Sequence, residues 1–131
     1  MSHRLTRRSF IQSAAAAGFG LPLIRTNAFA SENDQLHVGC VGVGGKGWSD
    51  MMETAKSPHV TIQAICDIDD SAKHLGRAAE QFPKATKYSD WRTLLDKEKL
   101  DALIVSTPDH MHAPVALSAI QRGLHVYCQK P

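Results

Sequence analysis

Short apolar runs typical of β-strands recur along the chain and are separated by longer segments with a different periodicity. Five such runs occupy residues 36–43, 60–66, 84–88, 102–106 and 125–128. The run at 102–106 reads A-L-I-V-S and has almost no polar position, which is typical of a strand buried on both faces of a sheet. The pattern therefore predicts five strands.

Four segments between these runs carry apolar residues at the three- to four-residue spacing of an amphipathic helix. The apolar stripes comprise Trp48, Met51, Met52 and Ala55; Ile68, Ala72, Leu75, Ala79 and Phe82; Trp91, Leu94 and Leu95; and Ala113, Ala116, Leu117 and Ile120. Pro58 and Pro83 are predicted to end the first two helices, because proline cannot continue the hydrogen-bond ladder. Ser89 is the predicted N-cap of the third helix, and Gly123 is the predicted C-cap glycine of the fourth.

This order, β-α-β-α-β-α-β-α-β, predicts an α/β fold. The expected architecture is a Rossmann-like, doubly wound parallel sheet with helices on both faces. Ligands of such sheets bind beyond the carboxyl ends of the strands. The residues with the most distinctive chemistry cluster at those ends, at 42–47, at Asp67, at 107–112 and at 129–131.

The first thirty residues differ from the rest and have the three-part layout of a secretory signal. Residues 1–9 are polar and basic, residues 10–23 are mostly small and apolar, and residues 28–30 form an A-x-A cleavage pattern. The apolar stretch is too short and too rich in Gly and Ala for a stable membrane span. Two adjacent arginines, Arg7 and Arg8, stand before Ser-Phe-Ile and resemble a twin-arginine signal.

An ordinary secretory signal is the alternative. The twin-arginine interpretation predicts the twin-arginine translocase as a partner, a periplasmic or otherwise exported protein, and cleavage after Ala30 that leaves residues 31–131. That route carries folded proteins, so it favours an enzyme that binds its cofactor before export.

The amino-acid composition excludes several classes of function. The chain has 131 residues, of which 43% are hydrophobic and 21% charged, as in a soluble globular domain. The net charge of +2 is misleading, because residues 1–30 hold four of the 15 Lys and Arg residues and none of the 13 acids. The remainder is mildly acidic, and aromatic residues make up only 6%. We therefore expect no nucleic-acid partner, and no membrane partner after cleavage.

Three cysteines, Cys40, Cys66 and Cys128, each lie in a strand-like run. Their odd number fits no disulfide framework, and the expectation is buried free thiols. A Cys40–Cys66 disulfide would require that their strands are neighbours with suitable side-chain geometry.

A glycine-rich turn carries the candidate cofactor chemistry. The first strand runs into a G-x-G-x-x-G sequence that opens a helix: Gly42, Val43, Gly44, Gly45, Lys46 and Gly47. Asp67 follows Gly47 by 20 residues, at the end of the next strand, which is the spacing of a dinucleotide-binding fingerprint. Gly42 would allow the tight turn, Gly44 the approach of a pyrophosphate, and Gly47 close packing of helix and strand. A glycine-rich turn that binds nothing is the alternative.

The acidic side chain of Asp67 favours one of the two nicotinamide dinucleotides. Its carboxylate would accept hydrogen bonds from the adenosine ribose hydroxyls, whereas a 2′-phosphate would meet a like charge. We therefore expect NAD rather than NADP, although Lys73 and Arg77 in the following helix would offset the repulsion in part. The turn is not a P-loop, because Lys46 is followed by glycine.

Two further strand ends carry polar residues. The segment 107–112 reads T-P-D-H-M-H, and its two histidines with Asp109 lack a further nearby ligand, so no metal site is predicted. These residues either face a cofactor ribose or begin a helix. Lys130 follows the last strand and would orient or polarise a substrate hydroxyl or carbonyl, unless it is a plain surface lysine.

Together these motifs resemble the Gfo/Idh/MocA family of oxidoreductases. The matching pieces are V-G-x-G-x-x-G at 41–47, Asp67, T-P-D-H-M-H-A at 107–113 and G-L-H-V-Y-C-Q-K-P at 123–131. The resemblance implies an NAD(P)-binding Rossmann domain over residues 31–131 that is truncated before a second, C-terminal α/β domain. It places Thr107, Pro108 and His112 beside the cofactor and Lys130 near the nicotinamide and substrate.

One position departs from the family. Gln129 stands where the family usually has Glu, and its amide would still bind a ribose while adding no negative charge beside Lys130.

The resemblance implies an exported NAD-dependent oxidoreductase acting on a sugar, cyclitol or polyol. Lys130 would assist proton transfer, and the 131-residue chain by itself would be inactive. Two alternatives stay open: an NAD-dependent glycoside hydrolase that works by oxidation, elimination and reduction, and a non-catalytic NAD-binding fragment. A homo-oligomer formed through the absent domain is a further expectation.

Overall fold

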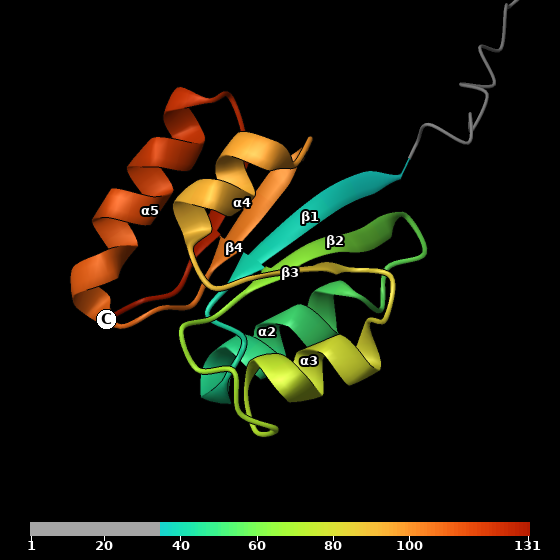
Figure 1. Cartoon of the computed structure of the whole chain (residues 1–131). Coiled ribbons are helices and arrows are strands. Elements are labelled where there is room, and N and C mark those ends of the chain that lie inside the picture. Colours follow the sequence, from blue (N-terminus) through green and yellow to red (C-terminus); the bar gives the residue numbers. More distant parts are fainter. Residues whose placement is uncertain (1–34) are drawn as a thin grey trace, which may run out of the picture. The chain divides into compact units, whose positions relative to one another are not determined.

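The computed structural model describes residues 35–131. The predicted signal segment and its cleavage after Ala30 lie outside this range. Strands and helices alternate as the sequence predicts (Figure 1). In chain order they are β1 (Leu36–Val41), α2 (Gly45–Thr54), β2 (Val60–Cys66), α3 (Leu75–Gln81), β3 (Thr86–Tyr88), α4 (Trp91–Lys97), β4 (Ala102–Val105), α5 (Asp109–Gln121) and β5 (His125–Cys128).

The strands form one parallel sheet in the order β3-β2-β1-β4-β5. After β3 the chain returns to the middle of the sheet and places β4 beside β1. The connections from β1 and β4 therefore leave in opposite directions, which opens a crevice at their carboxyl ends. The predicted Rossmann-like fold is confirmed.

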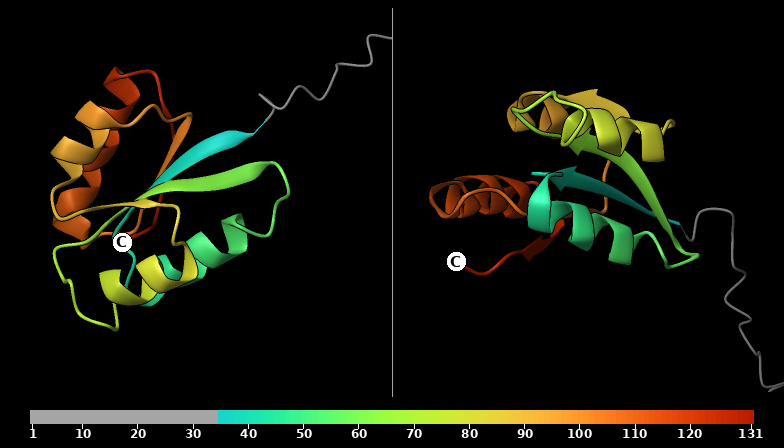
Figure 2. Two further views of the ribbon diagram at one scale, coloured as in Figure 1. Left: turned by 45° about the vertical axis from the view of Figure 1, so that its right-hand side comes forward. Right: turned by 90° about the horizontal axis from the view of Figure 1, so that it is seen from below.

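Helices cover both faces of the sheet (Figure 2). On one face, Met51 of α2 and Ala78 of α3 pack with Cys40 in one buried cluster. On the other, Leu94 of α4 and Val115 of α5 pack in a second cluster. Neighbouring strand residues alternate between the two clusters, because successive side chains of a strand point to opposite faces.

Several element boundaries differ from the prediction. β3 begins at Thr86 rather than at residue 84, and β4 ends at Val105 rather than at residue 106. β1 ends at Val41 rather than at residue 43, because Gly42 has a φ of 81° and turns the chain away. α3 begins at Leu75, and Ile68 lies in the preceding loop with 92% of its surface exposed. The N-cap of α4 is Asp90 rather than Ser89, and its side chain accepts a hydrogen bond from the backbone of Arg92.

The predicted buried face of α5 is wrong. Leu117 and Ile120 are 56% and 57% exposed, whereas Val115 and Ala119 are fully buried. Both sets have helical spacing, so the sequence alone could not choose between them. Packing against the sheet decided the rotation of the helix. The predicted C-cap glycine, Gly123, has the expected positive φ of 81°.

The cysteines are free thiols. Cys40 and Cys66 are buried as expected, but they belong to the clusters on opposite faces of the sheet and do not form a disulfide. Cys128 is exposed, contrary to the expectation, because it lies on the edge strand β5. Within residues 35–131, no helix is both long and apolar enough to cross a membrane.

Candidate functional site

The glycine-rich turn is folded tightly against itself and against the end of β4. A Cβ on Gly42 would lie 2.5 Å from the carbonyl oxygen of Ser106, and a Cβ on Gly47 would collide with the carbonyl oxygen of Gly42. Helix α2 begins at Gly45, and its N-cap, Gly44, has no side chain to cap it. The first-turn N–H groups and the positive end of the helix dipole thus face the crevice, as an anion-binding site requires.

Asp67 joins this turn to the carboxyl end of β2. Its Oδ2 accepts a hydrogen bond of 2.9 Å from the backbone N–H of Val43, and its Oδ1 accepts one of 3.0 Å from the backbone of Asp69. The Val43 side chain is fully buried. The carboxylate is therefore fixed in position beside the turn and retains lone pairs for further donors.

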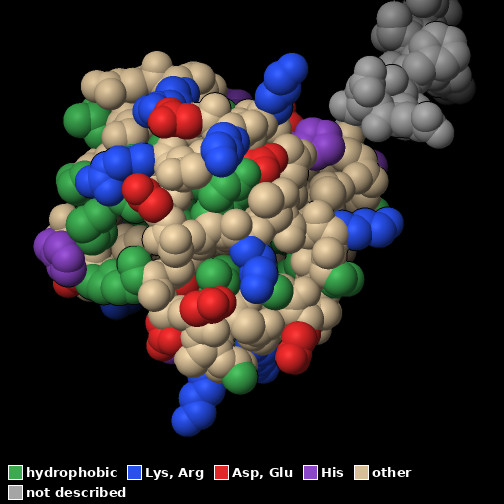
Figure 3. All heavy atoms as spheres, viewed as in Figure 1, with side chains coloured by type: hydrophobic (Ala, Val, Ile, Leu, Met, Phe, Trp, Pro, Cys, Tyr) green, Lys and Arg blue, Asp and Glu red, His purple; other side chains and the backbone are tan. Residues whose placement is uncertain are grey.

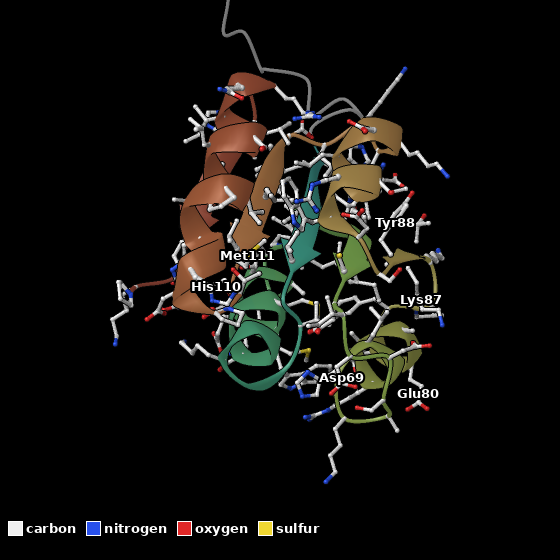
Figure 4. The ribbon with its side chains drawn as sticks, turned by 60° about the vertical axis from the view of Figure 1, so that its left-hand side comes forward. Asp69, Glu80, Lys87, Tyr88, His110 and Met111 are labelled. Atoms are coloured by element: carbon white, nitrogen blue, oxygen red, sulfur yellow. The ribbon has the colours of Figure 1, made fainter. Side chains whose placement is uncertain are left out.

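A pocket of about 380 Å³ lies over the carboxyl ends of β1, β2 and β4. The sequence-predicted residues that line it are Gly42, Gly44, Asp67, Thr107 and Pro108. Apolar walls come from Ile68, Trp91 and Met111. Asp69 on the loop after β2, and His110 and Met111 at the start of α5, lie at the same end of the sheet (Figure 4).

Two polar atoms in the pocket wall lack partners. Among residues 35–131, Nδ1 of His74 and Oγ1 of Thr107 are the buried side-chain atoms that make no hydrogen bond. Both residues line the pocket. Buried polar groups are normally satisfied, so two orphaned atoms in one cavity fit a polar ligand that supplies their partners.

A second polar cluster lies beside the pocket, around the buried carboxylate of Asp50. Ser106 donates to Oδ2 at 2.9 Å, the Gln129 amide donates to the same oxygen at 3.0 Å, and the ammonium of Lys46 lies 2.8 Å from Oδ1. Burial alone would raise the pKa of Asp50, but these three hydrogen bonds outweigh it and hold the pKa below its ordinary value. The carboxylate thus stays charged and ties α2 to the ends of β4 and β5.

Three of the predicted residues that lie outside the pocket lining are on α5 or follow β5. Lys130 is exposed, and its ammonium contacts the carbonyl of Pro131 at 3.3 Å. Gln129 is anchored by a backbone bond to Val105 and by its amide to Asp50. The ring of His112, on α5, lies 2.7 Å from the carbonyl oxygen of Thr107 and helps to hold that residue's backbone.

The turn residues that do not line the pocket are Val43, Gly45, Lys46 and Gly47. Gly45 has a φ of 50° and open space around its Cα. Lys46 extends from the first turn of α2 toward Asp50. Across residues 35–131, no group of three or more His, Cys, Asp or Glu side chains is arranged to hold a metal ion.

Sequence reasoning missed Asp50 and His74. Asp50 follows Lys46 by four positions on a helix, a spacing typical of an ion pair, but nothing local places it against β4 and β5. His74 falls within the predicted second helix, but α3 begins one residue later. The loop geometry after Asp67, which no sequence pattern specifies, brings its ring to the pocket.

Comparisons with known proteins agree with this geometry. The family described as "Oxidoreductase family, NAD-binding Rossmann fold" (GFO_IDH_MocA) matches residues 36–131. A "Glycosyl hydrolase family 109 protein" of Shewanella baltica is 30% identical over 158 aligned residues, which cover 98% of this chain and 34% of that protein. The chain therefore spans about a third of the length of this curated relative.

Two solved structures share the fold. Scyllo-inositol dehydrogenase from Lactobacillus casei, with bound NAD(H) and scyllo-inositol, superimposes with a TM-score of 0.68 at 26% identity, over 74% of this chain and 28% of that one. The WlbA dehydrogenase from Bordetella pertussis, in complex with NADH and UDP-GlcNAcA, has a TM-score of 0.67 at 28% identity, over 74% and 29%.

Proposed function

The chain belongs to the Gfo/Idh/MocA oxidoreductase family, as an NAD-binding Rossmann domain, and on that premise we propose that it binds NAD(H) in preference to NADP(H). The observation that carries the preference is the placement of Asp67. Its carboxylate is held by Val43 and Asp69 at the rim of the pocket, where a 2′-phosphate would meet a negative charge.

The residues present fit this dinucleotide. The glycines at 42 and 47 leave no room for side chains, the head of α2 offers free N–H groups, and the hydroxyl of Thr107 lacks a partner. Asp67 would accept the ribose hydroxyls and the α2 N-terminus would hold the pyrophosphate. The nicotinamide, when bound, supplies hydride transfer, while this chain's residues bind and orient it.

Calorimetric titration of the 131-residue chain with NAD⁺ and with NADP⁺ tests the proposal. We expect Asp67→Asn to weaken NAD⁺ binding about tenfold and to narrow the difference between the two ligands, because one charge-assisted interaction is lost. Glu80→Gln, an exposed change on α3, is the matched control (Figure 4). Unchanged NAD⁺ affinity in Asp67→Asn, with its thermal transition intact, would contradict the role of Asp67.

For the whole protein we propose hydride transfer at a carbon of a sugar, cyclitol or polyol, with Lys130 orienting the reacting hydroxyl. Support comes from the dehydrogenases above, which were solved with scyllo-inositol and UDP-GlcNAcA. Lys130 follows the carboxyl end of β5, which is the same end of the parallel sheet as the pocket, but it does not line the pocket.

A second candidate is a glycoside hydrolase that uses NAD without net consumption. The relative from Shewanella baltica, which aligns over nearly the whole chain, favours it. Incubation of the natural protein with scyllo-inositol and with a panel of 4-nitrophenyl glycosides separates the two. Accumulation of NADH supports the dehydrogenase, and release of nitrophenol without net redox change supports the hydrolase.

We also propose that residues 1–30 direct export by the twin-arginine route. The paired Arg7 and Arg8 support this proposal. Lys in place of both arginines should keep the charge and block export, whereas an Arg4→Lys change should leave it intact. Fractionation of cells that express each form gives the result, and export of the double variant would contradict the proposal.

A further inference from the structure

The imidazole of His74 fills a position between the glycine-rich turn and two carboxylates. Its Nδ1 lies 3.6 Å from Oδ2 of Asp67, and its Nε2 lies 3.7 Å from Oδ2 of Asp69. A Cβ on Gly44 would overlap with the ring. Gly44 therefore leaves space for the imidazole.

This ring has no full hydrogen bond to either neighbour. Nδ1 is buried and unpartnered, and both carboxylates stand slightly beyond hydrogen-bond distance. The side chain is 38% exposed, and the residue lines the same pocket as Asp67. The imidazole thus has unused hydrogen-bonding capacity beside the carboxylate of Asp67, which is proposed to bind the adenosine ribose.

The charged groups around the His74 ring determine how its protonation would affect the binding of an anionic ligand. Asp67 and Asp69 flank it, and His110 lies in the lining of the same pocket from α5. The turn contributes Gly44, which has no charge. Along its own segment, Lys73 is exposed, and the guanidinium of Arg77 stacks 3.7 Å above the Trp48 ring. With a neutral imidazole, the charged groups next to the ring are therefore the carboxylates of Asp67 and Asp69.

We propose that His74 is a cofactor-binding residue that makes the discrimination between NAD and NADP depend on pH. A neutral imidazole leaves Asp67 and Asp69 to repel a 2′-phosphate. A protonated imidazole places a positive charge between the two carboxylates, which offsets their repulsion of that phosphate. Histidine is the side chain that ordinarily gains its proton between pH 8 and 5, so the preference for NAD narrows on acidification. This inference rests on the proposed dinucleotide binding.

Calorimetric titration of the full chain with NAD⁺ and NADP⁺ between pH 8 and pH 5.5 tests the inference. We expect the ratio of the NADP⁺ Kd to the NAD⁺ Kd to fall about tenfold toward acid. Part of that fall comes from the ligand, because a phosphate monoester takes up its second proton near pH 6. The variant His74→Gln isolates the contribution of the phosphate, and in this variant the ratio of the two Kd values should fall only about threefold. His59→Gln, at the opposite end of β2, should match the unmodified protein.

A second measurement avoids any substitution at the site. Binding linkage is reciprocal, so a ligand that prefers the protonated ring must also raise the pH at which the ring titrates. The NMR titration midpoint of the His74 ring should move to higher pH with NADP⁺ and by less with NAD⁺.

The outcomes separate the two proposals. The role of His74 alone is overturned by two results together. In the first, NAD⁺ binds, but the ratio of the NADP⁺ Kd to the NAD⁺ Kd depends on pH in His74→Gln as it does in the unmodified chain. In the second, neither ligand changes the titration of the His74 ring. Failure of NAD⁺ to bind at any pH overturns the proposed function and this inference with it.

Discussion

The side-chain amide of Gln129 donates a hydrogen bond of 3.0 Å to the carboxylate of Asp50, 79 positions earlier in the chain. The same oxygen accepts the hydroxyl of Ser106, and the other oxygen pairs with Lys46. Asp50 is only 7% exposed. One buried carboxylate therefore connects the helix after the glycine-rich turn to the strand ends that carry Ser106 and Gln129.

Removal of this carboxylate should destabilise the fold. We expect Asp50→Ala to lower the free energy of unfolding by about 3 kcal/mol, because Ser106 and Gln129 lose a charged acceptor and Lys46 loses its partner. Asp50→Asn keeps an acceptor oxygen and should cost less. Urea denaturation measures both. The control, Glu53→Ala, changes an exposed acid of the same helix that pairs with Lys56 and should cost less than about 1 kcal/mol.

The same carboxylate should make stability depend on pH. The pKa of Asp50 is lowered from its ordinary value of 3.8. A lowered pKa gives stability that is fully present above the unfolded value and is lost as the pH falls from about 3.8 toward the folded value. The unmodified chain should therefore lose more stability on acidification through this range than Asp50→Asn. Parallel acid profiles from urea denaturation would argue against the ion pair in the folded state.

Glycines in the turn should differ in their tolerance of a methyl group. In Gly47→Ala the new Cβ collides with backbone of the same turn, which should cost about 3 kcal/mol. In Gly45→Ala the new Cβ meets open space, and only the positive φ opposes it, at about 1 kcal/mol. Thermal or urea unfolding compares the two, and equal costs would show that the turn rearranges freely.

The three thiols should differ in reactivity. Burial raises the pKa of Cys40 and of Cys66 to about 12, so almost no thiolate forms at neutral pH. Cys128 is exposed, although partial burial of its thiol raises its pKa too. A thiol-reactive dye at pH 8 should label one cysteine in the folded chain and three in urea. Rapid labelling of Cys40 without denaturant would contradict the packing of β1.

The exposed face of α5 should limit solubility. Hydrophobic side chains gather over this helix at the left of Figure 3, and Leu117 and Ile120 are more than half exposed. Ser in place of both should reduce light scattering on concentration and change the unfolding free energy by less than about 0.5 kcal/mol. By contrast, Val115→Ala leaves a cavity and should cost about 2 kcal/mol. If both variants lost the same free energy of unfolding, Leu117 would have to pack against the rest of the domain.

Much of the fold was predictable because its signals are local. Strands β2 and β5 match the predicted ranges, and Gly123 ends α5 with the expected backbone conformation. The G-x-G-x-x-G spacing and Asp67 meet at one sheet edge because parallel strands bring their carboxyl ends together. Such features depend on side-chain type and on neighbours within a few positions.

The sequence by itself thus determined the alternation of elements, the parallel sheet and the glycine-rich turn with its acidic partner. Only the tertiary structure decided which stripe of α5 is buried, that Cys40 and Cys66 face opposite layers, and that Asp50 and His74 belong beside the turn. The physical reason is that these outcomes depend on helix rotation, strand register and loop path. Long-range packing sets all three, and no local pattern encodes them.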